Sequence, residues 1–107
     1  MDNFNSLSKE EKVIKIKNLI DNPGREEAYF CLLKEMGDLK TNYADYMITE
    51  PIDSNKELKR LPDADYELTT AILTMLLRED HFINGSFERK QREGIVEKVL
   101  QHMIDTI

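Results

Sequence analysis

The sequence is poor in the residues and segments that mark specialised classes of protein. Its 107 residues include one cysteine, so the chain cannot close an internal disulfide. The longest uninterrupted apolar run, Ala28 to Leu33, is far shorter than the roughly 20 residues of a membrane-spanning helix. The first residues show no basic stretch that leads into an apolar one, so no signal peptide is visible. These absences predict a cytoplasmic protein that does not enter a membrane.

Residues that break helices are also scarce. The chain has four glycines and three prolines, while hydrophobic residues make up 40% of it and charged residues 34%. This composition is too apolar for a disordered chain and favours helices. The formal net charge of −6 is spread over both halves of the chain, so we expect it to repel the phosphate backbone of nucleic acids. The length suits one domain, which we assign to residues 1–107.

Apolar residues at helical spacing occupy the first part of the chain. Ser8 and Glu11 have the spacing of a capping box, so they predict the start of a first helix. The Asn-Pro-Gly sequence at 22–24 should end that helix. A second helix is predicted from Arg25 to Met36, with Gly37 in the left-handed conformation that closes many helices.

The next stretch predicts a third helix followed by a loop. Asp38 is suited to cap a helix that ends at Pro51, because the apolar residues between them keep helical spacing. Residues 51–62 form the least apolar connection in the chain, and we expect a mobile loop there. Within this loop, Ser54 and Glu57 could form a capping box for one short helical turn.

The most apolar helix is predicted from about Ala64 to Asp80. Apolar side chains cover most of its circumference, which is typical of a helix at the centre of a bundle. A turn at 81–85, a short helix capped by Ser86, and a final amphipathic helix after Gly94 should follow it. The sequence therefore predicts an all-α, single-domain bundle of five or six helices around the 64–80 helix.

From Ala64 onward, the sequence resembles a small bacterial family known only as a domain of unknown function. Its members share an apolar helix that leads into an Arg-x-Asp-(Arg or His)-Phe box, then a turn of small residues, a short helix that ends in glycine, and a final apolar helix. The family has no established activity, so the resemblance implies no particular reaction. His81 stands where we expect arginine in many relatives, which argues against a role that needs a permanent positive charge. The matching residues are Arg78, Asp80, His81, Phe82, Gly85 and Gly94.

This box lies at the end of the central helix and has a structural interpretation. Two acidic side chains, Glu79 and Asp80, stand at the negative end of the helix dipole, which costs up to ~1 kcal/mol unless something offsets it. In this interpretation, Asp80 accepts hydrogen bonds from backbone amides of the following turn. Arg78 pairs with a carboxylate, and Phe82 packs into the core. We favour this interpretation over the functional ones.

Two chemical alternatives exist for the same box. Asp80 and His81 could act as an acid/base pair, or Glu79 could join them in a metal site. Neighbours on a helix point about 100° apart, so these side chains converge poorly on one atom. The other candidates are a boundary histidine, His102, and Cys31, which we expect to be a small buried apolar residue. Since no phosphate-binding loop or paired Cys-x-x-Cys is present either, we predict no catalytic residue, metal or cofactor.

Arg89, Lys90 and Arg92 form the one basic cluster in the sequence. The order of helix, turn and short helix could be read as a helix-turn-helix element. Its second helix, at 86–93, would then direct these three side chains towards DNA phosphates or base edges. Acidic residues nearby balance their charge, so nucleic-acid binding is the alternative interpretation and not the main one.

The sequence thus predicts a non-enzymatic protein-interaction or regulatory module. It would bind an unidentified protein partner or a second copy of itself. Four methionines, at 36, 47, 75 and 103, would provide adaptable contacts wherever they are exposed. The candidate interaction residues are Arg78, Asp80, His81, Phe82, Arg89, Lys90 and Arg92.

Overall fold

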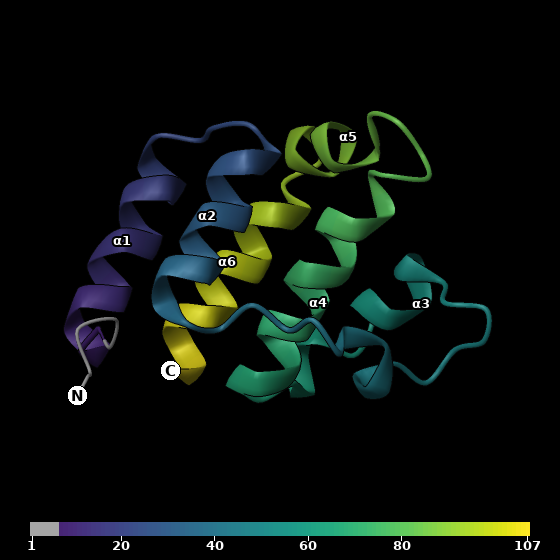
Figure 1. Cartoon of the computed structure of the whole chain (residues 1–107), viewed down its shortest axis with the longest axis horizontal. Coiled ribbons are helices and arrows are strands. Elements are labelled where there is room, and N and C mark those ends of the chain that lie inside the picture. The colour runs from purple at the N-terminus through teal and green to yellow at the C-terminus, as the bar shows by residue number, and fades with distance from the viewer. Residues whose placement is uncertain (1–6) are drawn as a thin grey trace.

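The computed structural model describes residues 7–107 and consists there of helices and connecting turns, without β-strands (Figure 1). This confirms the all-α fold class. The α-helices are α1 (Lys9–Asp21), α2 (Glu26–Met36), α3 (Ser54–Leu58), α4 (Tyr66–Glu79), α5 (Ser86–Arg92) and α6 (Ile95–Thr106). Two short 3-10 helices, η2 (Tyr43–Tyr46) and η3 (Leu61–Asp63), lie in the connections on either side of α3.

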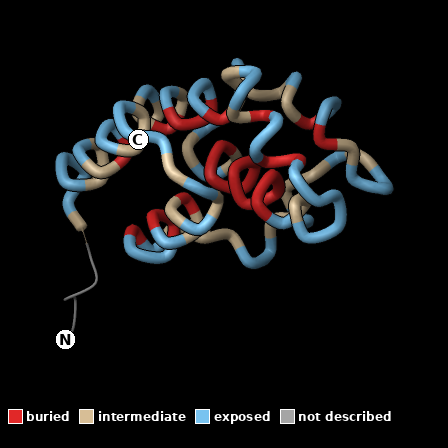
Figure 2. Tube along the Cα trace, turned by 90° about the horizontal axis from the view of Figure 1, so that it is seen from above, coloured by how far each residue is buried: buried red, intermediate tan, exposed pale blue. Residues whose placement is uncertain are grey.

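Helix α4 lies at the centre of the bundle, as predicted. It packs against α2, α3, α5 and α6, and every residue in the range 69–77 is buried, which appears as the continuous red helix in Figure 2. Three of these residues are threonines whose hydroxyls donate to carbonyls of the preceding turn; Thr74 Oγ1, for example, lies 2.9 Å from the carbonyl oxygen of Thr70. Because each hydroxyl has a partner, the polar atoms can be buried without a large desolvation cost.

The long helices around α4 each contribute an apolar face. Helix α6 buries Val96, Val99, Leu100 and Met103, while α1 buries Ile16. From α2, the buried side chains are Tyr29, Leu32, Leu33 and Met36. Met36, Met75 and Met103 all belong to this core, so these three are not exposed and do not provide the adaptable contacts that exposure would allow.

The predicted ends of the first two helices are confirmed. The amide of Glu11 donates to the hydroxyl of Ser8, and the amide of Ser8 donates to the carboxylate of Glu11, so both bonds of the capping box are present. At the end of α2, Gly37 has φ 75°. A side chain at this position would be strained, which explains why glycine closes the helix.

The predicted third helix is wrong, because only Tyr43–Tyr46 forms a single 3-10 turn in this stretch. Apart from a few local bonds of the 3-10 type, the backbone here bonds to other elements. The amide of Lys40 donates to Thr74 Oγ1 on α4. The amides of Ile48 and Thr49 donate to the carboxylate of Glu57 on α3. Tertiary partners therefore replace the ladder that an α-helix would need.

The segment predicted as a mobile loop contains α3, which is anchored by a buried carboxylate. Glu57 has no exposed surface, and it accepts hydrogen bonds from Ile48, Thr49 and Arg60. The helical turn is confirmed, but its cap is Asp53, whose carboxylate accepts from the amide of Lys56. The predicted cap, Ser54, lies inside the helix and donates its hydroxyl to Glu79 of α4.

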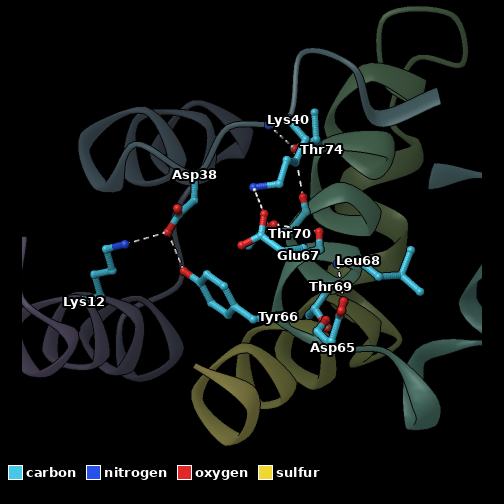
Figure 3. Close-up of polar contacts among 10 residues, drawn as sticks. All are labelled: Lys12, Asp38, Lys40, Asp65, Tyr66, Glu67, Leu68, Thr69, Thr70 and Thr74. Carbon is cyan, nitrogen blue, oxygen red and sulfur yellow. Dashed lines mark hydrogen bonds and ion pairs between the residues drawn. The ribbon is translucent and has the colours of Figure 1, made fainter. Parts of the chain in front are cut away.

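A polar network joins the first half of the chain to the start of α4 (Figure 3). Asp38 accepts from the hydroxyl of Tyr66 at 2.6 Å and pairs with the ammonium of Lys12 at 3.1 Å. Lys40 reaches the carboxylate of Glu67 at 2.9 Å, in addition to the bond from its amide to α4. These contacts fix the segment after α2 against the central helix, from Tyr66 to Thr74.

Candidate functional site

The turn between α4 and α5 is held by Asp80, as the structural interpretation predicted. Its carboxylate Oδ1 lies 3.1 Å from the amide nitrogen of Gly85 and 3.1 Å from that of Phe87. Asp80 thus satisfies backbone donors at the start of α5, where the helix dipole favours a negative charge. Gly85, with φ 85°, occupies the cap position predicted for Ser86. Ser86 is the first residue of the helix, so its hydroxyl does not cap it.

Beside this turn, the N-terminal half of α2 and the end of α4 enclose a cleft of about 710 Å³. This volume is in the range typical of ligand-binding sites. The apolar part of its lining comes from Phe30, Leu77 and the carbon and sulfur atoms of Cys31. Charged and polar side chains complete the lining: Glu26, Glu27, Arg78, Asp80, His81 and Asn84.

A smaller cavity of about 330 Å³ adjoins the first one. Glu26, Asp80 and Asn84 line both, so these three residues lie between the two cavities. The smaller cavity continues towards α5, where Phe87 and Gln91 contribute to its lining. Gln91 also donates to the carbonyl of Gly24, so the α2 and α5 sides of this cavity are tied together.

Glu26 and Asp80, which line both cavities, influence each other's ionisation. Hydrogen bonding to Asp80, followed by burial, raises the pKa of Glu26 above its ordinary value. The same hydrogen bond, together with the amides of Phe87 and Gly85, lowers the pKa of Asp80. Among the ion pairs formed by residues 7–107, none includes Glu26, Glu27 or Asp80.

Phe82 does not pack into the core, so that prediction is wrong. Its side chain is 85% exposed, and the next residue, Ile83, is 51% exposed. The core position is filled by Phe87, which is 2% exposed and whose ring centroid lies 5.1 Å from that of Tyr29. The turn places Phe87 inward because its amide is fixed by Asp80.

Arg78 and His81 are exposed side chains that line the cleft. The predicted pairing of Arg78 with a carboxylate is wrong within residues 7–107, where none of the ion pairs includes it. Glu79 points away from both, because its carboxylate accepts from Ser54 and Lys90. Glu79, Asp80 and His81 therefore do not converge on one point, as their spacing on the helix indicated.

The basic cluster is divided by the fold. Arg89 and Arg92 are exposed, and Arg92 lies 3.8 Å from Glu88 on the preceding turn. Lys90 is only 7% exposed, and its ammonium lies 3.2 Å from Glu79. The expectation that Lys90 faces nucleic-acid phosphates together with the two arginines is therefore wrong.

The remaining candidates behave differently from one another. His102 is a boundary residue, as expected, with Nε2 2.8 Å from the carbonyl oxygen of Ala64. Cys31 was expected among the buried residues, but it is exposed at the cleft. Within residues 7–107, no three histidine, cysteine or acidic side chains are grouped to hold a metal ion. None of the described helices is both long and apolar enough to span a bilayer.

Sequence reasoning missed the α2 side of this site. Glu26 and Glu27 stand in the first turn of α2, where acidic residues are common because they favour the helix dipole. Phe30 and Cys31 belong to an apolar run that suggested complete burial. Only the position of α2 against the end of α4 shows that these four residues face the predicted box.

Comparisons of the chain with known protein families, with curated proteins and with solved structures found no match. The resemblance to the bacterial family of unknown function therefore stays a prediction. The function has to be argued from the geometry of the site.

Proposed function

We propose that this protein is a non-enzymatic interaction module of the cytoplasm, and that it binds a segment of another protein. Its docking surface comprises the cleft between α2 and α4 together with Phe82 and Ile83, which stand in the chain between two lining residues, His81 and Asn84. The observation that carries this proposal is the exposure of Phe82, which is 85% even though the side chain is a large aromatic. Aromatic side chains are enriched at protein interfaces and often dominate the binding energy.

The backbone of this turn supports a docking role. The amides of Phe82 and Ile83 both lie 2.9 Å from the carbonyl oxygen of Glu79, and Asp80 holds the following residues. The backbone that carries these two adjacent apolar side chains is therefore held by hydrogen bonds to Glu79 before it and by those of Asp80 to the residues after it. A partner that binds such a turn has less conformational entropy to remove than one that binds a free loop.

The charges favour a protein partner over a nucleic acid. Because Lys90 is paired with Glu79, only Arg89 and Arg92 of the basic cluster are exposed to contact a nucleic acid. Three carboxylates line the cleft and would repel phosphate groups. The helix-turn-helix alternative would need these two arginines to outweigh that repulsion and the net charge of −6.

A displayed library of random peptides tests this proposal while the partner is still unidentified. We expect the protein to enrich peptides that bind the wild type and lose most of their affinity for Phe82→Ser. The matched control is Ile14→Ser, because Ile14 is 66% exposed on α1, away from the cleft lining. Fluorescence anisotropy would measure both affinities. Enrichment of no peptide, or of peptides that bind Phe82→Ser as tightly as the wild type, would overturn the proposal.

A further inference from the structure

The cleft carries an excess of negative charge that the described part of the chain leaves without ion pairs. Its lining includes the carboxyl groups of Glu26, Glu27 and Asp80, against one arginine, Arg78, and one histidine, His81. Glu35, an exposed acidic residue on the same helix, differs from them in that it pairs with a lysine. The three carboxyl groups of the cleft have no such partner among residues 7–107.

Two of these carboxyl groups come from different helices and are neighbours, because Glu26 and Asp80 both line the cleft and the smaller cavity beside it. Glu26 belongs to the first turn of α2, and Asp80 is fixed at the end of α4 by the amides of Gly85 and Phe87. Because Asp80 is held in place, it cannot turn away from Glu26. The like charges repel each other unless a proton or a cation lies between them.

We infer that the segment bound in this cleft is cationic, with an arginine or lysine that inserts between Glu26 and Asp80 and has apolar neighbours. This inference rests on the docking function proposed above and names the chemistry of its partner. A guanidinium group can donate to two carboxylates at once, which suits a pair of neighbouring acids. The aliphatic stem of such a side chain would lie against Phe30 and Leu77, which form the apolar part of the lining.

The exposed side chains of Phe82 and Ile83 indicate what the rest of the bound segment should contain. Phe82 and Ile83 follow Asp80 closely in the chain, so apolar residues of the partner would contact them while its cation occupies the cleft. The net charge of −6 would also attract a basic segment from a distance, and this attraction should weaken as salt is added. The expected partner is therefore a short basic segment with apolar flanks.

The enriched peptides described above provide the test, since their sequences report the chemistry directly. We expect an arginine or lysine next to apolar residues in the peptides whose binding depends on Phe82. Glu26→Gln should weaken their binding about tenfold, because one charge-assisted hydrogen bond is replaced by a neutral one. Glu93→Gln is the control, as Glu93 is an exposed carboxylate that does not line the cleft.

A double-mutant cycle identifies the contact itself. Replacing the arginine of the peptide by citrulline should weaken binding to the wild type about tenfold, but should change binding to Glu26→Gln much less. Glu26→Gln removes one charge of a repelling pair, so the variant should fold, and its circular dichroism and melting temperature would verify this. Equal losses with the wild type and with Glu26→Gln would overturn the inference.

The outcomes also separate this inference from the proposed function. Peptides that depend on Phe82 but carry no basic residue would overturn the cationic motif and leave the docking function standing. A failure to enrich any Phe82-dependent peptide would remove the docking function. A dimer detected by sedimentation that Phe82→Ser dissociates would assign the surface to a second copy of the chain, and would likewise overturn the inference.

Discussion

The ammonium of Lys90 lies 3.2 Å from the carboxylate of Glu79 and is almost completely buried there. This pair joins α5 to the end of α4. The other oxygen of Glu79 accepts from the hydroxyl of Ser54, so the same carboxylate also holds α3. One side chain of the predicted basic cluster therefore belongs to the framework around the turn, and only its neighbours, Arg89 and Arg92, are exposed.

Lys90→Met should lower the free energy of unfolding by about 2 kcal/mol, because it leaves the partly buried carboxylate of Glu79 without its cation. The control is Arg89→Met, which also replaces a basic side chain by methionine but at an exposed neighbour, and it should alter stability by less than about 0.5 kcal/mol. Urea denaturation of both variants would measure the difference. Equal stability of the two variants would show that the pair contributes little to the fold.

The two phenylalanines on either side of the turn should respond in opposite ways. Phe87→Ala should cost about 3–5 kcal/mol, since it opens a cavity beside Tyr29 in the core. Phe82→Ala should change the free energy of unfolding by less than about 0.5 kcal/mol, because the side chain is exposed. Thermal or urea unfolding would compare them. A large destabilisation by Phe82→Ala would contradict the exposed placement and weaken its proposed role in docking.

Glu57 should make stability depend on pH. Burial by itself would raise the pKa of this carboxyl, but the hydrogen bonds from Thr49, Arg60 and Ile48 prevail and lower the pKa below its ordinary value of 4.5. The stabilisation is therefore present above pH 4.5 and is lost as the pH falls through the lower pKa of the folded state. Below that pKa, both the folded and the unfolded chain carry the proton, so this contribution to the free energy of unfolding is gone.

Glu57→Gln should accordingly destabilise the protein by about 3 kcal/mol at neutral pH, because its amide group cannot accept from all of these donors. The difference from the wild type should shrink as the pH falls below 4.5. Glu50→Gln, at an exposed carboxylate in the preceding connection, is the matched control. Urea denaturation at a series of pH values would record both curves. A difference that stays constant with pH would contradict this assignment.

Tyr66 should resist ionisation in the folded protein. Burial raises the pKa of its hydroxyl most strongly, and the hydrogen bond to the carboxylate of Asp38 adds to this effect. Tyr66→Phe should therefore leave the tyrosinate absorbance gained between about pH 9 and 11 unchanged while the fold persists. In denaturant, the same variant should lose about a quarter of this absorbance, since the chain has four tyrosines. A reduced signal in the folded variant would show that Tyr66 titrates normally.

The sequence by itself determined the parts of this protein that depend on local interactions. The capping box of Ser8 and Glu11, the left-handed Gly37 and the apolar stripe of α4 follow from contacts within a few residues. The same holds for the role of Asp80, which accepts amides of the turn that directly follows it. These features could be predicted because their partners lie close in the chain.

Tertiary structure alone decided which of two similar residues is buried. Phe82 and Phe87 are both phenylalanines, and Arg89 and Lys90 are both basic. The packing of α5 on α4 nevertheless exposes the first of each pair and buries the second. It also placed α2 beside the end of α4, which created the cleft and brought Glu26 to Asp80. Helix packing brings together residues that are distant in the chain, and a local sequence pattern does not specify which helices will pack against each other.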